Sequence, residues 1–189
     1  MFERDRRRYL VAHLALHEIL LGYLPSAPAG LSFDIGANGK PRLSQALAPS
    51  GIEFNLSHSS EIALLAVCHG REVGVDIEYV KEDFEFQEVA ERFFTAREVA
   101  AMRGLPQILQ RQAFFKCWTS KEAFLKAKGT GLSGALDEVE IALFSEQQVA
   151  ISAAVPGWTL MELNSIDGYE AALVIEESPV SIHYYLWNS

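Results

Sequence analysis

Apolar residues recur at helical spacing in several segments of the chain. Between residues 5 and 24 they fall three or four positions apart, until a glycine and a proline end the pattern. A second helix is predicted over residues 106–128, because proline suits a first helical turn and the glycine that follows suits the stop. A further helix should begin after Thr95, where Thr-Ala-Arg-Glu forms a capping box.

Runs of β-branched and aromatic residues between turn signals predict strands in the rest of the chain. Asn38-Gly39 marks a tight turn between two short strands, and IEFNLS follows as another strand. EIALLAVC and EVGVDIE flank a glycine, and we expect them to be neighbouring antiparallel strands. The later strands are predicted at VEIAL, QVAI, WTLMEL, YEAALVI and VSIHYYLW. This pattern predicts an α+β protein of two intimate halves, over residues 1–80 and 81–189.

Composition narrows the classes of protein that fit this pattern. The 189 residues are 49% hydrophobic with a mean hydropathy of +0.08, which excludes a disordered or fibrous chain. The formal charge of −9 argues against a protein that mainly coats nucleic acid or anionic lipid. Cys68 and Cys117 lie in apolar runs and are expected to be buried, reduced thiols, so we expect a cytoplasmic protein. No segment is apolar and long enough to span a membrane.

The N-terminal segment has two interpretations. A basic stretch, an apolar stretch and the small residues at 27–29 resemble a signal peptide. However, Glu3 and Asp5 interrupt the basic part, while His13, His17 and Glu18 interrupt the apolar part. An amphipathic helix of the folded protein is therefore the preferred interpretation.

The first candidate chemistry is a pair of carboxylates in an apolar strand. Asp76 and Glu78 stand two positions apart in VGVDIE, so they project from the same face of the strand. One interpretation is a strand end whose acidic face meets solvent. The other is a Mg²⁺ site, because this hard cation binds carboxylate oxygens and is commonly shared with substrate phosphates.

Two further groups of polar residues are candidates for the same site. Helical spacing places Trp118, Glu122 and Lys126 on one helix face, where Glu122 could complete a metal site and Lys126 could neutralise a leaving phosphate. Without that context, an ordinary surface ion pair is the better interpretation. The hydroxyl and imidazole of Ser57 and His58 could hold phosphate oxygens, although a polar turn with local side-chain capping is the better interpretation of this segment by itself.

Taken together, these motifs carry a resemblance to a known family. NGKP, FNLSHS, GVDIE, FFTAREV and WTSKEAFLKAKGTGL stand in the order and approximate spacing of the 4'-phosphopantetheinyl transferase superfamily, Sfp type. The resemblance covers roughly residues 1–135. It implies the fold of that family, in which two similar halves, each a small antiparallel sheet with a packed helix, form a pseudo-dimer that acts as a monomer.

The resemblance also implies an activity and its partners. The enzyme would move the phosphopantetheine arm of coenzyme A onto a serine of an acyl or peptidyl carrier protein, and would release adenosine 3',5'-bisphosphate. It would require Mg²⁺ and use coenzyme A as co-substrate, with no nucleic acid or membrane partner. Fatty acid, polyketide and nonribosomal peptide systems all stay open as sources of the carrier.

By the same resemblance, individual residues take roles. Asp76, Glu78 and Glu122 would bind Mg²⁺ against the pyrophosphate of coenzyme A. Glu122 would also be the base for the carrier serine, directly or through a metal-bound water, and Lys126 would stabilise charge on the pyrophosphate during transfer. The other expected contacts are Ser57 and His58 to the phosphates, Lys40 and Pro41 at the nucleotide end, and Glu98 as an additional acidic site residue. These assignments make Asp76, Glu122 and Lys126 the catalytic residues.

Two more expectations concern partners and alternatives. Residues 97–128 carry seven lysines and arginines against two glutamates, a local balance of +5, and could dock an acidic carrier protein. A non-catalytic module that binds coenzyme A or the carrier protein is the alternative from another class. A Mg²⁺-dependent nucleotide hydrolase is a further alternative, although the chain has no phosphate-binding loop of the P-loop type.

Overall fold

The computed structural model describes most of the chain. The residues outside its description are 1, 2, 25–29, 132–135, 137, 138, 146–148, 154, 164, 165, 178–180, 188 and 189. The small residues at 27–29 that resemble a cleavage site lie outside the described residues. In the part of the chain that is described, no helix is long and apolar enough to cross a bilayer.

The first half of the chain forms one long helix and five strands. In order these are α1 (Glu3–Tyr23), β1 (Phe33–Ile35), β2 (Pro41–Leu43), the 3-10 turn η1 (Ala48–Ser50), β3 (Ile52–Ser59), β4 (Ile62–His69) and β5 (Val73–Tyr79). The first predicted helix is therefore confirmed, as are the short strands on either side of the Asn38-Gly39 turn, which pair antiparallel.

The second half contains three helices and four strands. They are α2 (Phe86–Phe93), α3 (Ala96–Gly104), α4 (Gln107–Lys128), β6 (Ala142–Ser145), β7 (Val149–Ser152), β8 (Trp158–Glu162) and β9 (Tyr169–Glu176). The predicted capping box is present, since the Thr95 hydroxyl accepts from the Glu98 N–H and the Glu98 carboxylate accepts from the Thr95 N–H. Gly129 ends α4 in the left-handed conformation, as predicted.

Two expectations about secondary structure are wrong. Residues 181–187, most of the predicted strand VSIHYYLW, form no strand, and Tyr185 and Leu186 are 83% and 85% exposed. Their alternation and β-branched composition favour a strand, but a strand also needs a partner that supplies hydrogen bonds. The helix α2 was not anticipated, because it lies within a stretch that reads mainly as acidic; it buries Phe86 and Ala90.

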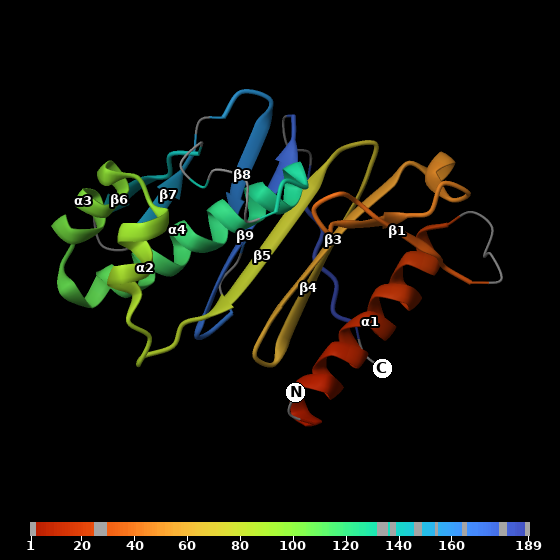
Figure 1. The fold of residues 1–189 in the computed structure, drawn as a ribbon, viewed down its shortest axis with the longest axis horizontal. Coiled ribbons are helices and arrows are strands. Elements are labelled where there is room, and N and C mark those ends of the chain that lie inside the picture. The colour runs from red at the N-terminus through yellow and green to blue at the C-terminus, as the bar shows by residue number, and fades with distance from the viewer. Residues whose placement is uncertain are drawn as a thin grey trace.

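All strands pair antiparallel, in the orders β1-β2, β3-β4, β5-β9-β8 and β6-β7. A long helix packs on each main group: the core residues Leu16 and Leu20 of α1 contact β2 and β3, and α4 lies across β5, β9 and β8 (Figure 1). The protein is therefore α+β with a packed helix on each of two antiparallel sheets. The division of the chain at residue 80 stays a prediction. Strand β5, which comes before residue 80, pairs with β9, which comes after it.

Side chains rather than a backbone ladder join β3 to β5. The backbone N–H of Val75 donates to Asn55 Oδ1 (2.8 Å), and that of Tyr79 donates to Ser59 Oγ (3.0 Å). The contacts advance in the same direction along both strands, so β3 and β5 run parallel, side by side in Figure 1. We call this contact the β3/β5 seam.

The expected pairing of β4 with β5 is wrong. β4 forms its ladder with β3 over eight residues, from Ile52 opposite His69 to Ser59 opposite Ile62, and β5 forms its ladder with β9. A tight hairpin after Ser59 brings β4 directly back along β3, where Ser60 adopts a positive φ of 50°. The short connection between β4 and β5 still brings Leu64, Ala66 and Cys68 against the buried cluster that contains Val73 and Val75.

A buried ion pair ties α3 to α4. Lys121 Nζ lies 2.8 Å from Glu98 Oε1, and both side chains are 1% exposed. Lys121 also donates to the carbonyls of Leu136 and Val139, and Glu98 Oε1 accepts from the N–H of Ile141. The family resemblance makes Glu98 an additional acidic site residue, but these partners place it in the interior, where the ion pair holds Leu136, Val139 and Ile141 against the helices.

We predict that Glu98→Gln lowers the free energy of unfolding by about 3–5 kcal/mol, because it leaves the Lys121 ammonium buried without a counter-charge. Urea denaturation measures this change. The matched control Glu91→Gln removes an exposed pair with Arg103 and should cost less than about 1 kcal/mol. Equal losses in the two variants would show that the buried pair has no special importance.

Candidate active site

An open cavity of about 440 Å³ lies where the two halves meet. Its walls come from α1, β2, β3, β5 and α4. The residues that line it are His13, Leu16, Pro41, Leu56, Ser57, His58, Asp76, Glu78, Trp118, Glu122 and Lys126. Seven of the nine site residues expected from the sequence therefore share one cavity, and Lys40 and Glu98 do not line it.

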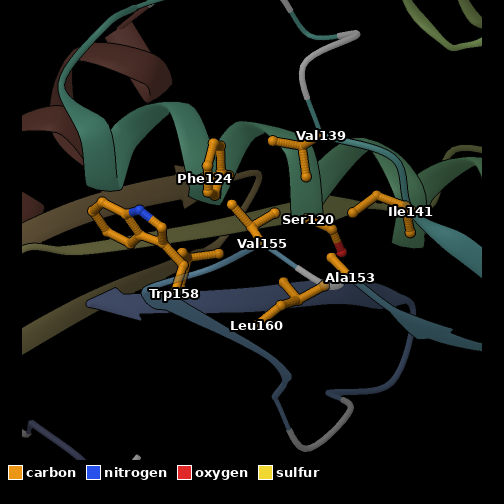
Figure 2. A pocket seen from close by; sticks show the side chains of 9 residues that line it. Ser120, Phe124, Val139, Ile141, Ala153, Val155, Trp158 and Leu160 are labelled. Carbon is orange, nitrogen blue, oxygen red and sulfur yellow. The ribbon is translucent and has the colours of Figure 1, made fainter. Parts of the chain in front are cut away.

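A second cavity is apolar and much smaller, about 10 Å³, roughly the space of one water molecule. It lies beneath α4, where Phe124, Val139 and Trp158 are among the residues pointing into it (Figure 2). Its one hydroxyl, that of Ser120, donates to the carbonyl of Lys116. A space of this size is a gap in the packing of the core and is too small for a ligand of the size of a nucleotide.

A glycine lets α4 approach β5 closely enough to form the larger cavity. Side chains alternate along β5, so Gly74 shares a face with Asp76 and Glu78, and that face meets α4. A Cβ on Gly74 would lie 2.1 Å from the carbonyl oxygen of Ala123 and 2.3 Å from the nitrogen of Ala127. Only glycine fits at this position. Because Gly74 has no Cβ, α4 lies close enough to β5 for Lys126 to reach Asp76.

This packing brings a lysine of α4 to the acidic strand. Lys126 Nζ donates to Asp76 Oδ1 (2.6 Å) and to Ser57 Oγ (2.9 Å), and Ser57 Oγ donates to the same Asp76 oxygen (2.8 Å). Ser59 Oγ donates to Glu78 Oε2 (2.8 Å). The β3/β5 seam therefore orients both carboxylates of the strand.

Two carboxylate oxygens of the site are buried without a hydrogen-bond partner: Asp76 Oδ2 and Glu122 Oε1. Burial raises the pKa of Asp76, against the opposing charge of Lys126, and also raises the pKa of Glu78. Burial, reinforced by the Asp76 charge, raises the pKa of Glu122 to about 7. Three carboxyl groups with one ammonium make the cavity favourable for an additional cation.

The donor chemistry fits Mg²⁺, which prefers carboxylate oxygens and commonly takes one or two of them together with water and substrate phosphates. Across the described parts of the chain, no three His, Cys, Asp or Glu side chains are close enough to hold a metal by themselves. The two unpartnered oxygens of Asp76 and Glu122 are therefore the protein ligands that a shared metal would find, with Glu78 beside them.

The remaining expected residues occupy different positions. His58 is exposed on the cavity wall, and Pro41 lines it. Ser57 is buried and already bonded to Asp76 and Lys126. Lys40 points into the interior, and we return to its partners below.

Several lining residues were not assigned a role from the sequence. His13 and Leu16 come from α1, and Leu56 comes from β3. The carbonyl oxygen of Tyr9 lies 2.9 Å from His13 Nδ1, so Nδ1 donates a hydrogen bond to this oxygen. The other ring nitrogen, Nε2, takes no part in that bond. Trp118 lines the cavity with Glu122 and Lys126, which confirms the helix face predicted from their spacing. Helical periodicity could have placed His13 and Leu16 on one face of a helix. It could not have shown that this face meets residues of other elements.

The basic docking face expected over residues 97–128 stays a prediction, and the structure gives many of its basic residues partners within the chain. Lys121 is buried against Glu98, Lys116 pairs with Glu162 and Glu170, and Arg111 donates to two backbone carbonyls. The others also have partners: Arg97 with Glu140, Arg103 with Glu91, Lys126 with Asp76, and Lys128 over the Phe124 ring. Because α4 is largely buried, most of its cations neutralise the interior and the cavity instead of facing a partner.

The chain is similar to known proteins of one family. Residues 72–174 match the family model of the 4'-phosphopantetheinyl transferase superfamily. The 4'-phosphopantetheinyl transferase HetI of Nostoc sp. is 41% identical over 92% of this chain, which spans 73% of HetI. A putative 4'-phosphopantetheinyl transferase of Synechocystis sp., slr0495, is 36% identical over 72% of this chain, which spans 55% of that relative.

Among solved structures, a holo-(acyl-carrier-protein) synthase from Bacillus anthracis in complex with CoA (3',5'-ADP) is 21% identical. The match covers 57% of this chain and 96% of that one, with a TM-score of 0.46.

We predict that Glu122 makes the metal-free protein less stable as pH rises from about 4.5 to about 7. The folded pKa lies above the ordinary value of 4.5, so the folded state binds more protons across this window. The contribution of Glu122 to the free energy of unfolding is fully present below pH 4.5 and is lost above about pH 7. Unfolding by urea at several pH values, with a chelator present, should show that Glu122→Gln weakens this loss. If wild type and variant differ by a constant amount from pH 4.5 to 8, the assignment is wrong.

Proposed function

This chain belongs to the 4'-phosphopantetheinyl transferase superfamily and is a transferase of that kind, and we propose that the cavity between its halves is where the transfer takes place. Coenzyme A would enter with its pyrophosphate beside the carboxylates, and a serine of an acyl or peptidyl carrier protein would receive the phosphopantetheine arm. Adenosine 3',5'-bisphosphate would leave. The observation that carries the proposal is the convergence of Asp76, Glu78, Glu122 and Lys126 on one cavity.

The residues of the cavity answer two needs of this reaction. A serine hydroxyl is a poor nucleophile at neutral pH, and a pyrophosphate repels an approaching electron pair until its charge is offset. Glu122 lines the cavity with one buried carboxylate oxygen, Oε1, that has no hydrogen-bond partner, and it is suited to take the hydroxyl proton. The serine oxygen then forms a bond to the phosphorus that carries the pantetheine, and the bond from that phosphorus to the leaving bisphosphate breaks.

Lys126 is suited to stabilise the leaving phosphate. An ammonium group has three donors, and Lys126 uses two of them, on Asp76 and Ser57. The side chain is 30% exposed on the cavity side, so its third donor is available to a phosphate oxygen. Mg²⁺ bound through Asp76, Glu122 and Glu78 would supply further positive charge against the pyrophosphate.

The rest of the cavity is assigned to binding. The exposed imidazole of His58 would contact phosphate oxygens, and Pro41 would contact the nucleotide end of coenzyme A. The single hydroxyl hydrogen of Ser57 is donated to Asp76, so Ser57 would orient that carboxylate instead of contacting a phosphate. We assign the carrier protein as the partner and expect the enzyme to act as a cytoplasmic monomer, without nucleic acid or membrane. The alternative is a module of the same fold that binds coenzyme A or the carrier without transfer.

We predict that incubation with coenzyme A and Mg²⁺ adds phosphopantetheine to an apo carrier protein, and that a chelator prevents the addition. Asp76→Ala and Glu122→Ala should each reduce the rate by at least ~10³-fold, since each removes a group that acts on the reacting atoms. Glu91→Ala, which changes an exposed carboxylate in α2, is the control and should match the wild type. Intact-mass spectrometry of a panel of carriers measures the addition.

Three results would contradict this assignment. No addition to any carrier, with coenzyme A binding still detectable by calorimetry, would favour the non-catalytic module. Hydrolysis of coenzyme A with the carrier unmodified would favour a hydrolase. Near-normal transfer in Asp76→Ala or Glu122→Ala would remove the carboxylates from the mechanism.

A further inference from the structure

Lys40 is a buried lysine whose donors are all used inside the protein. Its side chain is 6% exposed, and Nζ donates to Glu72 Oε2 (2.8 Å) and to the carbonyl oxygens of Val73 (3.0 Å) and Ala127 (3.0 Å). An ammonium has three hydrogens, so none is left for a phosphate or a nucleotide. The side chain therefore acts on the protein itself.

The three partners of Lys40 belong to segments that are far apart in the sequence. Glu72 and Val73 lie at the start of β5, and Ala127 lies in the last turn of α4. The last carbonyls of a helix lack partners within it, and a cation at that end is favoured by the helix dipole. Asn38, in the same loop, donates from Nδ2 to the carbonyl of Gly129 (2.9 Å). Residues 36–40 of the first half thus cap the end of α4.

This cap lies beside the closest approach of α4 to β5. Val73 precedes Gly74, and Ala127 is one of the two α4 residues that lie against Gly74, so the Lys40 bonds join the strand and the helix at their closest approach. The distance of 2.6 Å between Lys126 and Asp76 depends on that approach. A small shift of the last turn of α4 along β5 would carry Lys126 away from Asp76, and Glu122 with it.

We propose that Lys40 is a positioning residue of the transfer reaction: its ammonium clamps the last turn of α4 to the start of β5 and so holds Glu122 and Lys126 beside Asp76. The proposal rests on the proposed function. It differs from a nucleotide contact, which the motif NGKP suggests by resemblance, because a positioning residue acts on the chemical step and a nucleotide contact acts on the binding of coenzyme A.

The two roles separate in steady-state kinetics of the full chain with a carrier protein and Mg²⁺. Lys40→Met keeps an unbranched side chain of similar length and removes all three hydrogen bonds. We expect kcat to fall by roughly 10–100-fold, because misplacement of reacting groups by about 1 Å costs that much. We expect the KM for coenzyme A, and its dissociation constant measured by calorimetry, to change by less than about threefold.

A matched control separates positioning from lost stability. Met102 is a buried residue of α3, and Met102→Ala leaves an empty space in the hydrophobic core. Met102 does not line the active-site cavity, so the Lys40 contacts stay untouched. Assayed well below the melting temperature of each variant, Met102→Ala should keep the wild-type kcat. If Lys40→Met does not fold, Asn38→Ala takes its place, because it removes the companion bond to Gly129 and should lower kcat several-fold with KM unchanged.

Several outcomes would overturn the inference. A raised KM with unchanged kcat would make Lys40 a nucleotide contact, and wild-type kinetics would show that the clamp is dispensable. An equal fall of kcat in Met102→Ala would reduce the effect to stability, and unchanged kcat in Asn38→Ala, where that variant is needed, would contradict the clamp. Absence of transfer in the wild type is a different result, because it refutes the proposed function itself.

Discussion

The close packing of α4 against β5 at Gly74 is the constraint on which the site depends. With no Cβ at this position, the backbone of Ala123 and Ala127 lies against the strand. The helix then presents Glu122 and Lys126 to the carboxylate of Asp76 two residues further along β5. A wider separation would leave three acids and a lysine on two distant surfaces, where each would be an ordinary solvated charge. The chemistry of the cavity is thus a consequence of how closely two backbones approach.

The β3/β5 seam supplies the second condition. Parallel neighbours usually share a backbone ladder, whereas here Asn55 and Ser59 bond the backbone of β5 through their side chains. The same row of polar side chains includes Ser57, which bonds Asp76 and Lys126. The β3/β5 seam therefore joins the two sheets and also orients Asp76 and Glu78. This arrangement explains why a run of polar residues, FNLSHS, occurs in a strand that is half-buried at the centre of the molecule.

Periodicity in the sequence predicts which residues share a face but not which faces meet. The spacing of Asp76 with Glu78, and of Glu122 with Lys126, follows from strand and helix geometry, and their convergence was expected only from the family resemblance. The sequence did not reveal which charged side chains are buried. Lys121, Glu98 and Lys40 were interpreted as surface or ligand-binding residues, but they lie in the interior. The strand expected over residues 181–187 failed for a related reason, because composition reports propensity and cannot supply a pairing partner.

The most direct test of this account is a crystal structure of the protein with coenzyme A and Mn²⁺, in which anomalous scattering locates the metal. We expect a metal bound by the free oxygens of Asp76 and Glu122. A pyrophosphate oxygen should be a further ligand, and Lys126 should lie within hydrogen-bond distance of the phosphates. Coenzyme A bound elsewhere, or a metal held by other carboxylates with this cavity empty, would contradict it.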